Sequence, residues 1–334
     1  MNIRRSVSFF MLRVSKIKSL KLIVQKLGLM ANFAKFYSKM GSHNLADRNQ
    51  PLVFLGESLI SPNQWDEKLR NARLSAADRD VSTFDLSNYA PLPSGKDLVC
   101  SVIGSIYKPG PHLLPFLRNL TEQSIFEKVD FILIGVSLED DEVERLISFS
   151  NKHSNVNLIL FEERISIYHA WNLGVREAKS NKITNMNVDD VRHFQSLEIQ
   201  VRELEGNPNT SVVYQDVYYM YEFLDTWSLI EAMGVRSCLP VVRTSILASG
   251  LNAPHNAPMW RRELHLTIGD FDESYLSAGD HDFWIRASIG GFEFQKSKYT
   301  HASYFINPSG MSTKPQSPGV IEGAKILDKY KKFA

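Results

Sequence analysis

Two acidic clusters in this 334-residue chain have the residue types that hold a metal ion and remove a proton. The first is Asn187-Val188-Asp189-Asp190, and the second is Asp280-His281-Asp282. Each cluster comes where an apolar stretch meets a turn, so we expect its carboxylates at the edge of a buried core. Carboxylate oxygens are the ligands that Mg²⁺ and Mn²⁺ prefer, and these ions keep coordination positions open for substrate phosphates. Together the two clusters suggest group transfer from a metal-bound phosphate ester.

The segment before the first cluster predicts the elements that position it. Apolar runs typical of buried parallel strands alternate with amphipathic helical stretches, and short connections join them. We expect strands at residues 98–104, 131–136, 156–161 and 183–187, and helices at residues 113–127, 141–152 and 167–178. Such alternation predicts a right-handed, mainly parallel α/β layer. Ligands bind such sheets beyond the carboxyl ends of the strands, which is where Asp189 and Asp190 follow.

The loop after the first strand narrows the choice of ligand. Residues 104–110 form neither a dinucleotide fingerprint nor a phosphate-binding P-loop. A diphosphate held without such a loop needs a metal to neutralise its charge. The Asp189-Asp190 pair suits that task, although Asp190 could instead be the N-cap of a helix that begins near Val191.

Composition and charge argue against several other classes of function. The chain is 43% hydrophobic, enough to bury one large domain, and its formal net charge of +1 gives no overall attraction to nucleic acid. Cys100 and Cys238 are its 2 cysteines, and they offer neither a disulfide framework nor a metal-binding spacing. We therefore expect a reducing, cytoplasmic location. No apolar run approaches the roughly 20 residues that a membrane-spanning helix needs.

The N-terminal region is predicted to be a basic helical extension over residues 1–46, with no acidic residue before Asp47. Ile17, Leu20 and Val24 recur at helical spacing beside several lysines. Three interpretations remain open: peripheral contact of residues 1–40 with the inner face of a membrane, packing on this protein or a partner, and an organelle transit peptide. A polar connector with a short helix at residues 65–74 is expected over residues 47–97.

Residues 98–313 resemble a family 2 glycosyltransferase of the GT-A fold. Residues 101–107 resemble the family's opening strand, and residues 167–175 resemble its internal helix. Asn187-Val188-Asp189-Asp190 is similar to its DXD-type metal motif. Residues 268–286 are similar to the block G-x-F-D-E … D-x-D-x-W-x-R before the last helix of the catalytic core. The resemblance implies a GT-A domain over residues 98–334, with a mixed, mainly parallel sheet flanked by helices.

The resemblance also implies roles for the acidic residues. Asp189 and Asp190 would bind Mn²⁺ or Mg²⁺ and the diphosphate of a nucleotide-sugar donor, with Asn187 supporting them. Asp280 would be the general base that deprotonates the acceptor hydroxyl, with inversion at the anomeric carbon. A competing interpretation makes Asp280 the N-cap of its helix.

Three further residues receive weaker assignments. The resemblance places Tyr107 and Asn172 near the donor nucleotide. His301 stands where related enzymes can place a third metal ligand, although a lone histidine is more often structural.

Departures from the family pattern leave the donor open. The family usually ends its second strand with an aspartate that contacts the nucleobase or ribose, whereas residues 135–137 here are Gly-Val-Ser. Gly279 stands where an acid often precedes the base. We expect an inverting enzyme of polysaccharide or glycoconjugate synthesis that uses a glycan or lipid-linked acceptor. The alternatives are a catalytically silent GT-A module and a nucleotidylyltransferase. A nucleotidylyltransferase would need a glycine-rich, arginine-bearing loop after the first strand, and residues 104–110 do not form one.

Overall fold

The computed structural model describes residues 53–55, 58–60, 67, 70–71, 81–95, 97–307, 310–311 and 316–334. The predicted basic extension (residues 1–46) lies outside them, as does most of the helix expected at residues 65–74. Within the connector, β1 (Val53–Leu55) and β2 (Ser58–Ile60) form an antiparallel pair.

The main sheet has seven strands in the described part of the chain, in the order β11-β7-β10-β6-β3-β4-β5. Only β10 runs antiparallel to its neighbours in this sheet, as its pairing with β6 and β7 shows. The predicted mixed, mainly parallel sheet is therefore confirmed. The strand bounds are Cys100–Tyr107 (β3), Val129–Val136 (β4), Val156–Phe161 (β5), Lys182–Asn185 (β6), Thr210–Tyr214 (β7), Met259–Arg261 (β10) and Glu293–Lys296 (β11).

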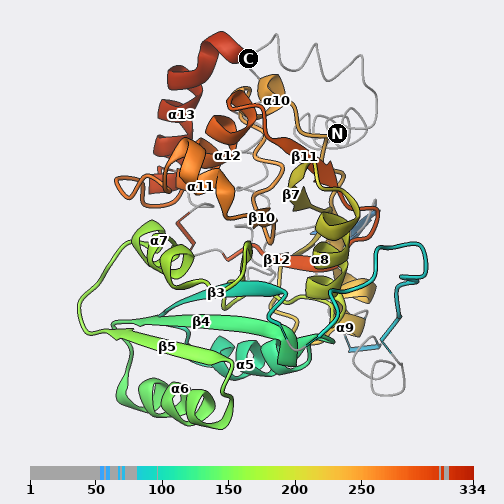
Figure 1. Ribbon diagram of the computed structural model, residues 1–334, viewed down its shortest axis with the longest axis vertical. Helices are drawn as coiled ribbons and strands as arrows, with labels where there is room; N and C mark the ends of the chain where they lie inside the picture. The colour runs from blue at the N-terminus through green and yellow to red at the C-terminus, as the bar shows by residue number, and fades with distance from the viewer. Residues whose placement is uncertain are drawn as a thin grey trace.

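Helices cover both faces of this sheet (Figure 1). The side chains of β3 and β4 alternate between the two faces, as they must on a pleated strand. Ile103 and Ile132 belong to one buried cluster with α7 and α12, whereas Val102 and Phe131 belong to another with α5 and α8. The helix bounds are Leu113–Thr121 (α5), Asp140–Lys152 (α6), Ile167–Glu177 (α7), Ser196–Gly206 (α8), Trp227–Met233 (α9), Thr244–Ala248 (α10), Glu263–Ile268 (α11), Gly279–Ile289 (α12) and Pro318–Tyr330 (α13).

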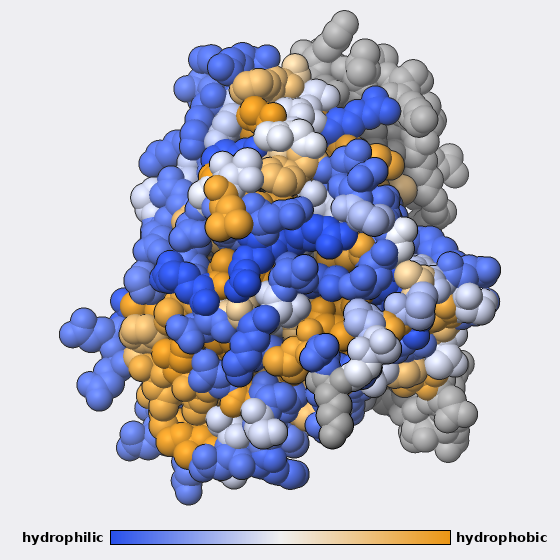
Figure 2. All heavy atoms as spheres, viewed as in Figure 1, coloured by the Kyte–Doolittle hydropathy of each residue, from blue (hydrophilic) through white to orange (hydrophobic). Residues whose placement is uncertain are grey.

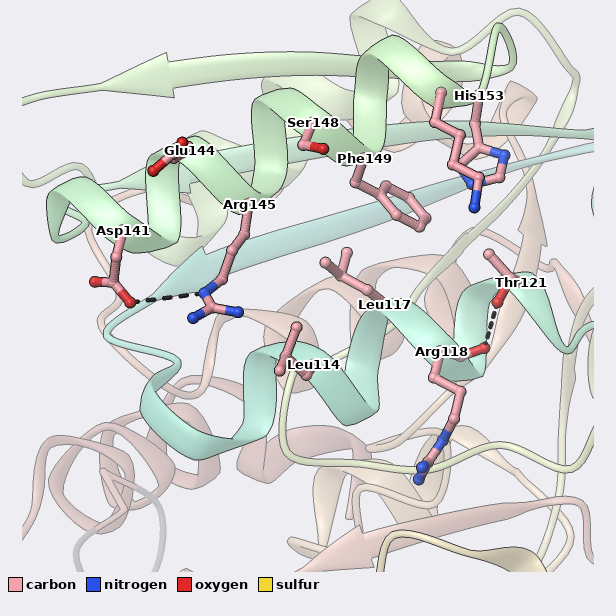
Figure 3. Close-up of a pocket in the computed structure, with 11 residues that line it drawn as sticks. Leu114, Leu117, Arg118, Thr121, Asp141, Glu144, Arg145, Ser148, Phe149 and His153 are labelled. Carbon is pink, nitrogen blue, oxygen red and sulfur yellow. Dashed lines mark hydrogen bonds and ion pairs between the residues drawn. The ribbon is translucent and has the colours of Figure 1, made fainter.

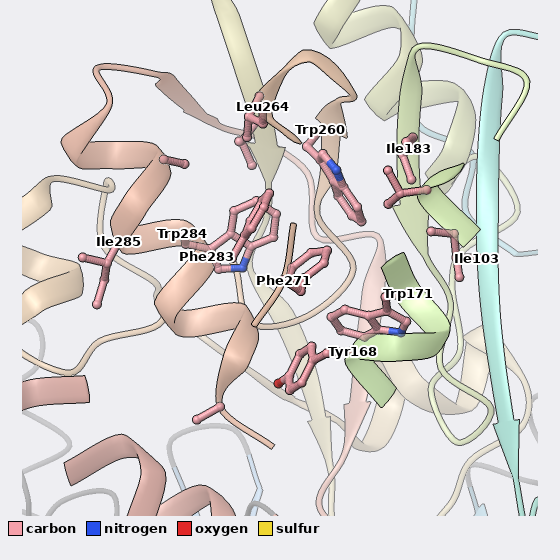
Figure 4. Packing of buried hydrophobic residues seen from close by; sticks show 14 of the residues in the cluster. Ile103, Tyr168, Trp171, Ile183, Trp260, Leu264, Phe271, Phe283, Trp284 and Ile285 are labelled. Atoms are coloured by element: carbon pink, nitrogen blue, oxygen red, sulfur yellow. The ribbon is translucent and has the colours of Figure 1, made fainter. Parts of the chain in front are cut away.

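An aromatic cluster fixes α12 against α7 (Figure 4). The ring of Phe271, in the loop before α12, stacks on Phe283 of α12 at 4.2 Å between centroids. It also meets Trp171 of α7 edge to face at 5.3 Å. Such pairs contribute about 0.5–1.5 kcal/mol each beyond the burial of their area. The packing therefore holds the start of α12 against α7.

A second, smaller sheet contacts the segment that follows β6. It has the order β12-β8-β9, with β12 (Ala302–Phe305) parallel to β8 (Val217–Met220) and β9 (Val235–Arg236) antiparallel to β8. An isolated bridge pairs Arg192 with Ala302, so β12 runs along the segment that follows the first acidic cluster. Among the residues described, no helix has the length and apolar character needed to cross a bilayer.

Candidate functional site

The first acidic cluster lies in the turn that follows β6. The side chain of Asp190 is buried and accepts two hydrogen bonds, one from the Phe305 backbone amide at 2.8 Å and one from the Asn187 side-chain amide at 2.7 Å. The alternative interpretation of Asp190 as a helix N-cap is wrong. The next helix, α8, begins only at Ser196, and Gln195 precedes it.

Asp189 is less buried than Asp190 and has no hydrogen bond from another residue in the described chain. Burial raises the pKa of the Asp189 carboxyl. Burial, and then the neighbouring charge of Asp189, raises the pKa of Asp190 well above its usual value. Two adjacent carboxylates therefore resist ionising together, and a divalent cation between them would offset that cost. This donor set fits Mg²⁺ or Mn²⁺ chemically.

A buried arginine, Arg192, interacts electrostatically with Asp190, and sequence reasoning did not identify it. The Arg192 guanidinium donates to the Thr184 hydroxyl at 2.6 Å and to the Gln200 side-chain oxygen at 2.8 Å. Burial lowers the pKa of Arg192 to about 9, so the side chain is still charged at neutral pH. Its charge favours the ionised form of Asp190. Asp190 and Arg192 line a narrow internal gap together with Asn187 and Asn256, and this gap has no room for a water molecule.

His301 directly precedes β12 and is fully buried. Its Nδ1 lies 2.8 Å from the Ser196 hydroxyl, whereas its Nε2 has no hydrogen-bond partner in the described chain. Burial, and then the charge of Arg192, lowers the pKa of His301 well below its usual value, so the imidazole is neutral. Within the part of the chain that the structure describes, no three His, Cys, Asp or Glu side chains gather as a ready-made metal site. The role of His301 as a third ligand stays a prediction.

The second acidic cluster lies in the first turn of α12. Asp280 is the second residue of this helix, and Ala278 occupies the N-cap position. The N-cap interpretation of Asp280 is therefore wrong. Its Oδ1 accepts a hydrogen bond from the Tyr168 hydroxyl at 3.2 Å, and its Oδ2 accepts one from the Asn252 side-chain amide at 2.7 Å. Both donors are uncharged groups, and they fix the orientation of the carboxylate.

The glycine at position 279 is explained by Tyr168. A Cβ atom at Gly279 would lie 2.8 Å from Cε2 of the Tyr168 ring, closer than real Cβ contacts. Tyr168 is 2% exposed, and its ring is held by the aromatic cluster. The acid that often precedes the base in related sequences therefore has no room here.

A loop and a strand connect the two acidic clusters. His255 is half-buried and interacts electrostatically with Asp280, and desolvation lowers the pKa of its imidazole. Its ring packs on Tyr304 of β12 at 5.4 Å between centroids. Tyr304 directly precedes Phe305, whose amide donates to Asp190. Residues far apart in sequence thus bring both clusters to one region of the molecule.

The side chain of Asn172 in α7 forms hydrogen bonds with the loop before α12. Its side-chain amide donates to the Phe271 carbonyl and to the Glu273 carboxylate, both at 2.9 Å, and its oxygen accepts from the Phe271 amide at 3.0 Å. The Glu273 carboxylate also lies 2.8 Å from Nδ1 of His169. The hydrogen bond from Asn172 is the main reason that the pKa of Glu273 is lowered. Donor contact by Asn172 stays a prediction.

Tyr107 ends β3 with its side chain partly exposed. The Arg164 guanidinium lies over its ring at 4.9 Å from the centroid, and the Lys108 ammonium lies at 5.5 Å. At the end of the neighbouring strand, Ser137 has a φ of 47° and donates its hydroxyl to the Glu162 carbonyl at 3.1 Å. Two cationic side chains thus flank Tyr107 near the position where the family usually has an aspartate, and a donor contact by Tyr107 stays a prediction.

A pocket of about 590 Å³ lies between α5 and α6, on the sheet face opposite α7 and α12 (Figure 3). Its lining includes Phe149 and the ion pair of Arg145 with Asp141 at 3.6 Å, and no residue of either acidic cluster contributes to it. Figure 2 shows apolar side chains gathered over β5 and α6, in keeping with the exposure of Leu160 and Ile147. The pocket is therefore separate from the candidate active site that the two acidic clusters form.

Comparison with known proteins gives a consistent answer. The model of a family described as "Glycosyltransferase like family 2" matches residues 114–300. The amylovoran biosynthesis glycosyltransferase AmsB of Erwinia amylovora is 25% identical over 221 residues, which cover 63% of this chain and 71% of AmsB.

Solved structures show a similar fold. Residues 1–349 of S. aureus TarS in complex with UDP-GlcNAc match with a TM-score of 0.53 at 14% identity, over 70% of this chain and 71% of that one. The mannosyltransferase PcManGT from Pyrobaculum calidifontis, in complex with GDP-Man and Mn²⁺, matches with a TM-score of 0.50 at 14% identity, over 81% of each chain. A longer TarS chain is matched over only 37% of its length.

Proposed function

The chain belongs to the glycosyltransferase-like family 2 and has a GT-A-like fold, and from this premise we propose that it is an inverting hexosyltransferase. It would move a sugar from a nucleoside-diphosphate donor to an acceptor hydroxyl. The observation that carries the proposal is Asp280, whose carboxylate is held by two uncharged hydrogen-bond donors at the start of α12.

Asp280 is proposed as the general base. A sugar hydroxyl is a weak nucleophile at neutral pH, and a positioned base that accepts its proton accelerates attack by about 10²–10⁴-fold. Tyr168 suits the orienting role because burial, and then the charge of Asp280, raises the pKa of its phenol well above the usual value, so it stays a donor. Attack on the anomeric carbon from the face opposite the leaving diphosphate inverts the configuration.

Asp189 and Asp190 are proposed to hold Mn²⁺ or Mg²⁺, with His301 as the candidate third ligand. When bound, the ion would offset the negative charge of the departing nucleoside diphosphate. Asn187 orients the carboxylate of Asp190 through its 2.7 Å hydrogen bond, and the Phe305 amide holds the other oxygen. The Mn²⁺ of the PcManGT complex supports a divalent ion here.

The similar proteins support the substrate classes. The TarS complex with UDP-GlcNAc and the PcManGT complex with GDP-Man support a nucleotide sugar as donor. The role of AmsB in amylovoran biosynthesis supports a glycan or lipid-linked acceptor in polysaccharide synthesis. Peripheral membrane contact through residues 1–40 stays a prediction.

A catalytically silent sugar-binding module is the second candidate. The end of β4 favours it, because Ser137 replaces the expected aspartate and its hydroxyl is bonded to Glu162. A silent module would bind a nucleotide sugar without breaking its glycosidic bond.

The test is release of nucleoside diphosphate from a panel of nucleotide sugars, with water or added glycans as acceptor. The wild-type chain should turn over one donor class, and Asp280→Asn should lower kcat by about 10²–10⁴-fold while nucleotide binding persists. Asp328→Asn, whose side chain is 78% exposed on α13, is the matched control. Equal rates for Asp280→Asn and wild type would refute the base, and binding without turnover by the wild type would favour the silent module.

A further inference from the structure

The C-terminal helix α13 lies beyond residues 114–300, which the family model matches, yet it contacts the segment that carries Asp280. The buried carboxylate of Glu322 accepts hydrogen bonds from three consecutive backbone amides, those of Leu276 at 2.8 Å, Ser277 at 2.9 Å and Ala278 at 3.0 Å. These amides directly precede α12.

Glu322 supplies the hydrogen-bond acceptor that the residues at the start of α12 do not provide. The first amides of a helix and of the loop before it need acceptors, and a side chain at the N-cap usually provides one. Ala278 occupies that position and has no side-chain acceptor. Glu322 provides the acceptor from another helix, through charge-assisted bonds and with a negative charge near the positive end of α12. The backbone immediately before Asp280 is thereby fixed.

A second contact fixes the residues immediately after Asp280. Asp282 is 1% exposed, and its Oδ1 accepts from the Lys329 ammonium at 2.7 Å and from the Tyr330 hydroxyl at 2.8 Å. Its Oδ2 accepts from Arg286 at 2.8 Å. Burial alone would raise the pKa of Asp282, but these hydrogen bonds outweigh it and lower the pKa. Asp282 is therefore ionised, and its hydrogen bonds with Lys329 and Tyr330 hold α12 against α13.

We propose that α13 is a positioning element for the general base, with Glu322, Lys329 and Tyr330 as its positioning residues. They hold both sides of Asp280, so that the carboxylate keeps its place relative to the acceptor hydroxyl. The inference rests on the base role of Asp280 in the proposed function. β12, which precedes α13 in the chain, holds Asp190 through the Phe305 amide, so the C-terminal segment contacts both acidic clusters.

The test is Glu322→Gln in the full chain, assayed by nucleoside-diphosphate release. A glutamine keeps the size of the side chain but offers a single acceptor oxygen and turns an NH₂ group toward the amides. Because misplacement of a catalytic group by about 1 Å can cost about 10²-fold, we expect kcat to fall at least about tenfold. KM for the donor and Kd for the nucleotide should stay within about twofold. Asp328→Asn on the same helix is the control and should keep the wild-type kcat.

A double-mutant cycle separates positioning from general support of the fold. In an Asp280→Asn background, Glu322→Gln should lower the residual rate by less than about twofold, because the group that it positions is already absent. Unchanged kcat in the single variant, or an equal loss in both backgrounds, would overturn the proposal. So would a parallel loss of nucleotide binding.

Two further outcomes complete the test. If Glu322→Gln does not fold, Tyr330→Phe replaces it, because this change removes the hydroxyl that donates a hydrogen bond to Asp282. We expect a severalfold loss of kcat with unchanged nucleotide Kd, and a wild-type kcat would overturn the proposal. If Asp280→Asn alone keeps the wild-type rate, the proposed base fails and the role of α13 fails with it. Loss in Asp280→Asn without loss in Glu322→Gln or Tyr330→Phe refutes the positioning role alone.

Discussion

Gly279→Ala is the substitution whose effect follows most directly from the geometry around Asp280, the proposed base. The new Cβ would lie 2.8–2.9 Å from three atoms of the Tyr168 ring, whereas ordinary contacts begin at 3.4 Å. The ring must therefore withdraw by about 0.6 Å to reach an ordinary contact (3.4 minus 2.8), and its neighbours Trp171 and Phe271 already pack against it. Overpacking of this kind costs about 1–3 kcal/mol of stability.

The same shift acts on catalysis. The bond from the Tyr168 hydroxyl to Asp280 is already 3.2 Å long, so a displacement of this size away from the carboxylate is enough to break it. A hydrogen bond to a charged group contributes about 1.5–3 kcal/mol. We therefore expect kcat/KM to fall by about 10- to 100-fold, since each 1.4 kcal/mol corresponds to a factor of about ten.

The assay is nucleoside-diphosphate release together with urea denaturation. Gly323→Ala is the matched control, because a Cβ at that position on α13 meets nothing within 4 Å. It should keep the wild-type rate and raise the free energy of unfolding by about 0.5–1 kcal/mol. Wild-type kcat/KM and stability in Gly279→Ala would refute the claim that Tyr168 needs a glycine beside the base.

Three other predictions concern the proposed metal site and the core. Asp190→Asn should weaken Mn²⁺-dependent nucleotide binding by about tenfold or more, measured by calorimetry; unchanged affinity would remove Asp190 from the site. His301→Gln should weaken the same binding if Nε2 is a ligand, and an unchanged Kd would make His301 structural. His265 accepts a bond from Trp260, and burial lowers its pKa from 6.5 to about 4. As pH drops from 6.5 to 4, His265 therefore takes up a proton in the unfolded chain but stays largely neutral in the folded one. The free energy of unfolding should fall by about 3 kcal/mol over this range. Urea denaturation should show this loss in the wild type but not in His265→Gln; an unchanged pH dependence would contradict it.

Elements with a strong local pattern could be predicted from the sequence. The apolar run at residues 156–161 corresponds to β5, and the helix expected at residues 167–178 corresponds to α7 (Ile167–Glu177). Boundaries were less accurate where pairing decides them. The first strand continues to Tyr107 because its last residues still pair with β4. The helix expected at residues 113–127 ends at Thr121, and a short 3₁₀ turn at Phe126–Lys128 then leads into β4.

The surroundings of the acidic clusters could not be predicted locally. The N-cap interpretations of Asp190 and Asp280 were reasonable from residue type, but the first residue of each helix is set by packing with distant segments. Tyr168 and Asp280 are 112 positions apart, and Glu322 lies more than 40 positions from the amides that it binds. Arg192 gave a single local signal, a basic residue two positions after Asp190.

The most direct test of the central claim is a calorimetric titration of the full chain with UDP, GDP, CMP and dTDP, with and without Mn²⁺. A glycosyltransferase that holds its donor through Asp189 and Asp190 should bind one of these nucleotides in the presence of Mn²⁺ and lose most of that affinity without the metal. Failure of every nucleotide to bind under both conditions would contradict the proposed donor site.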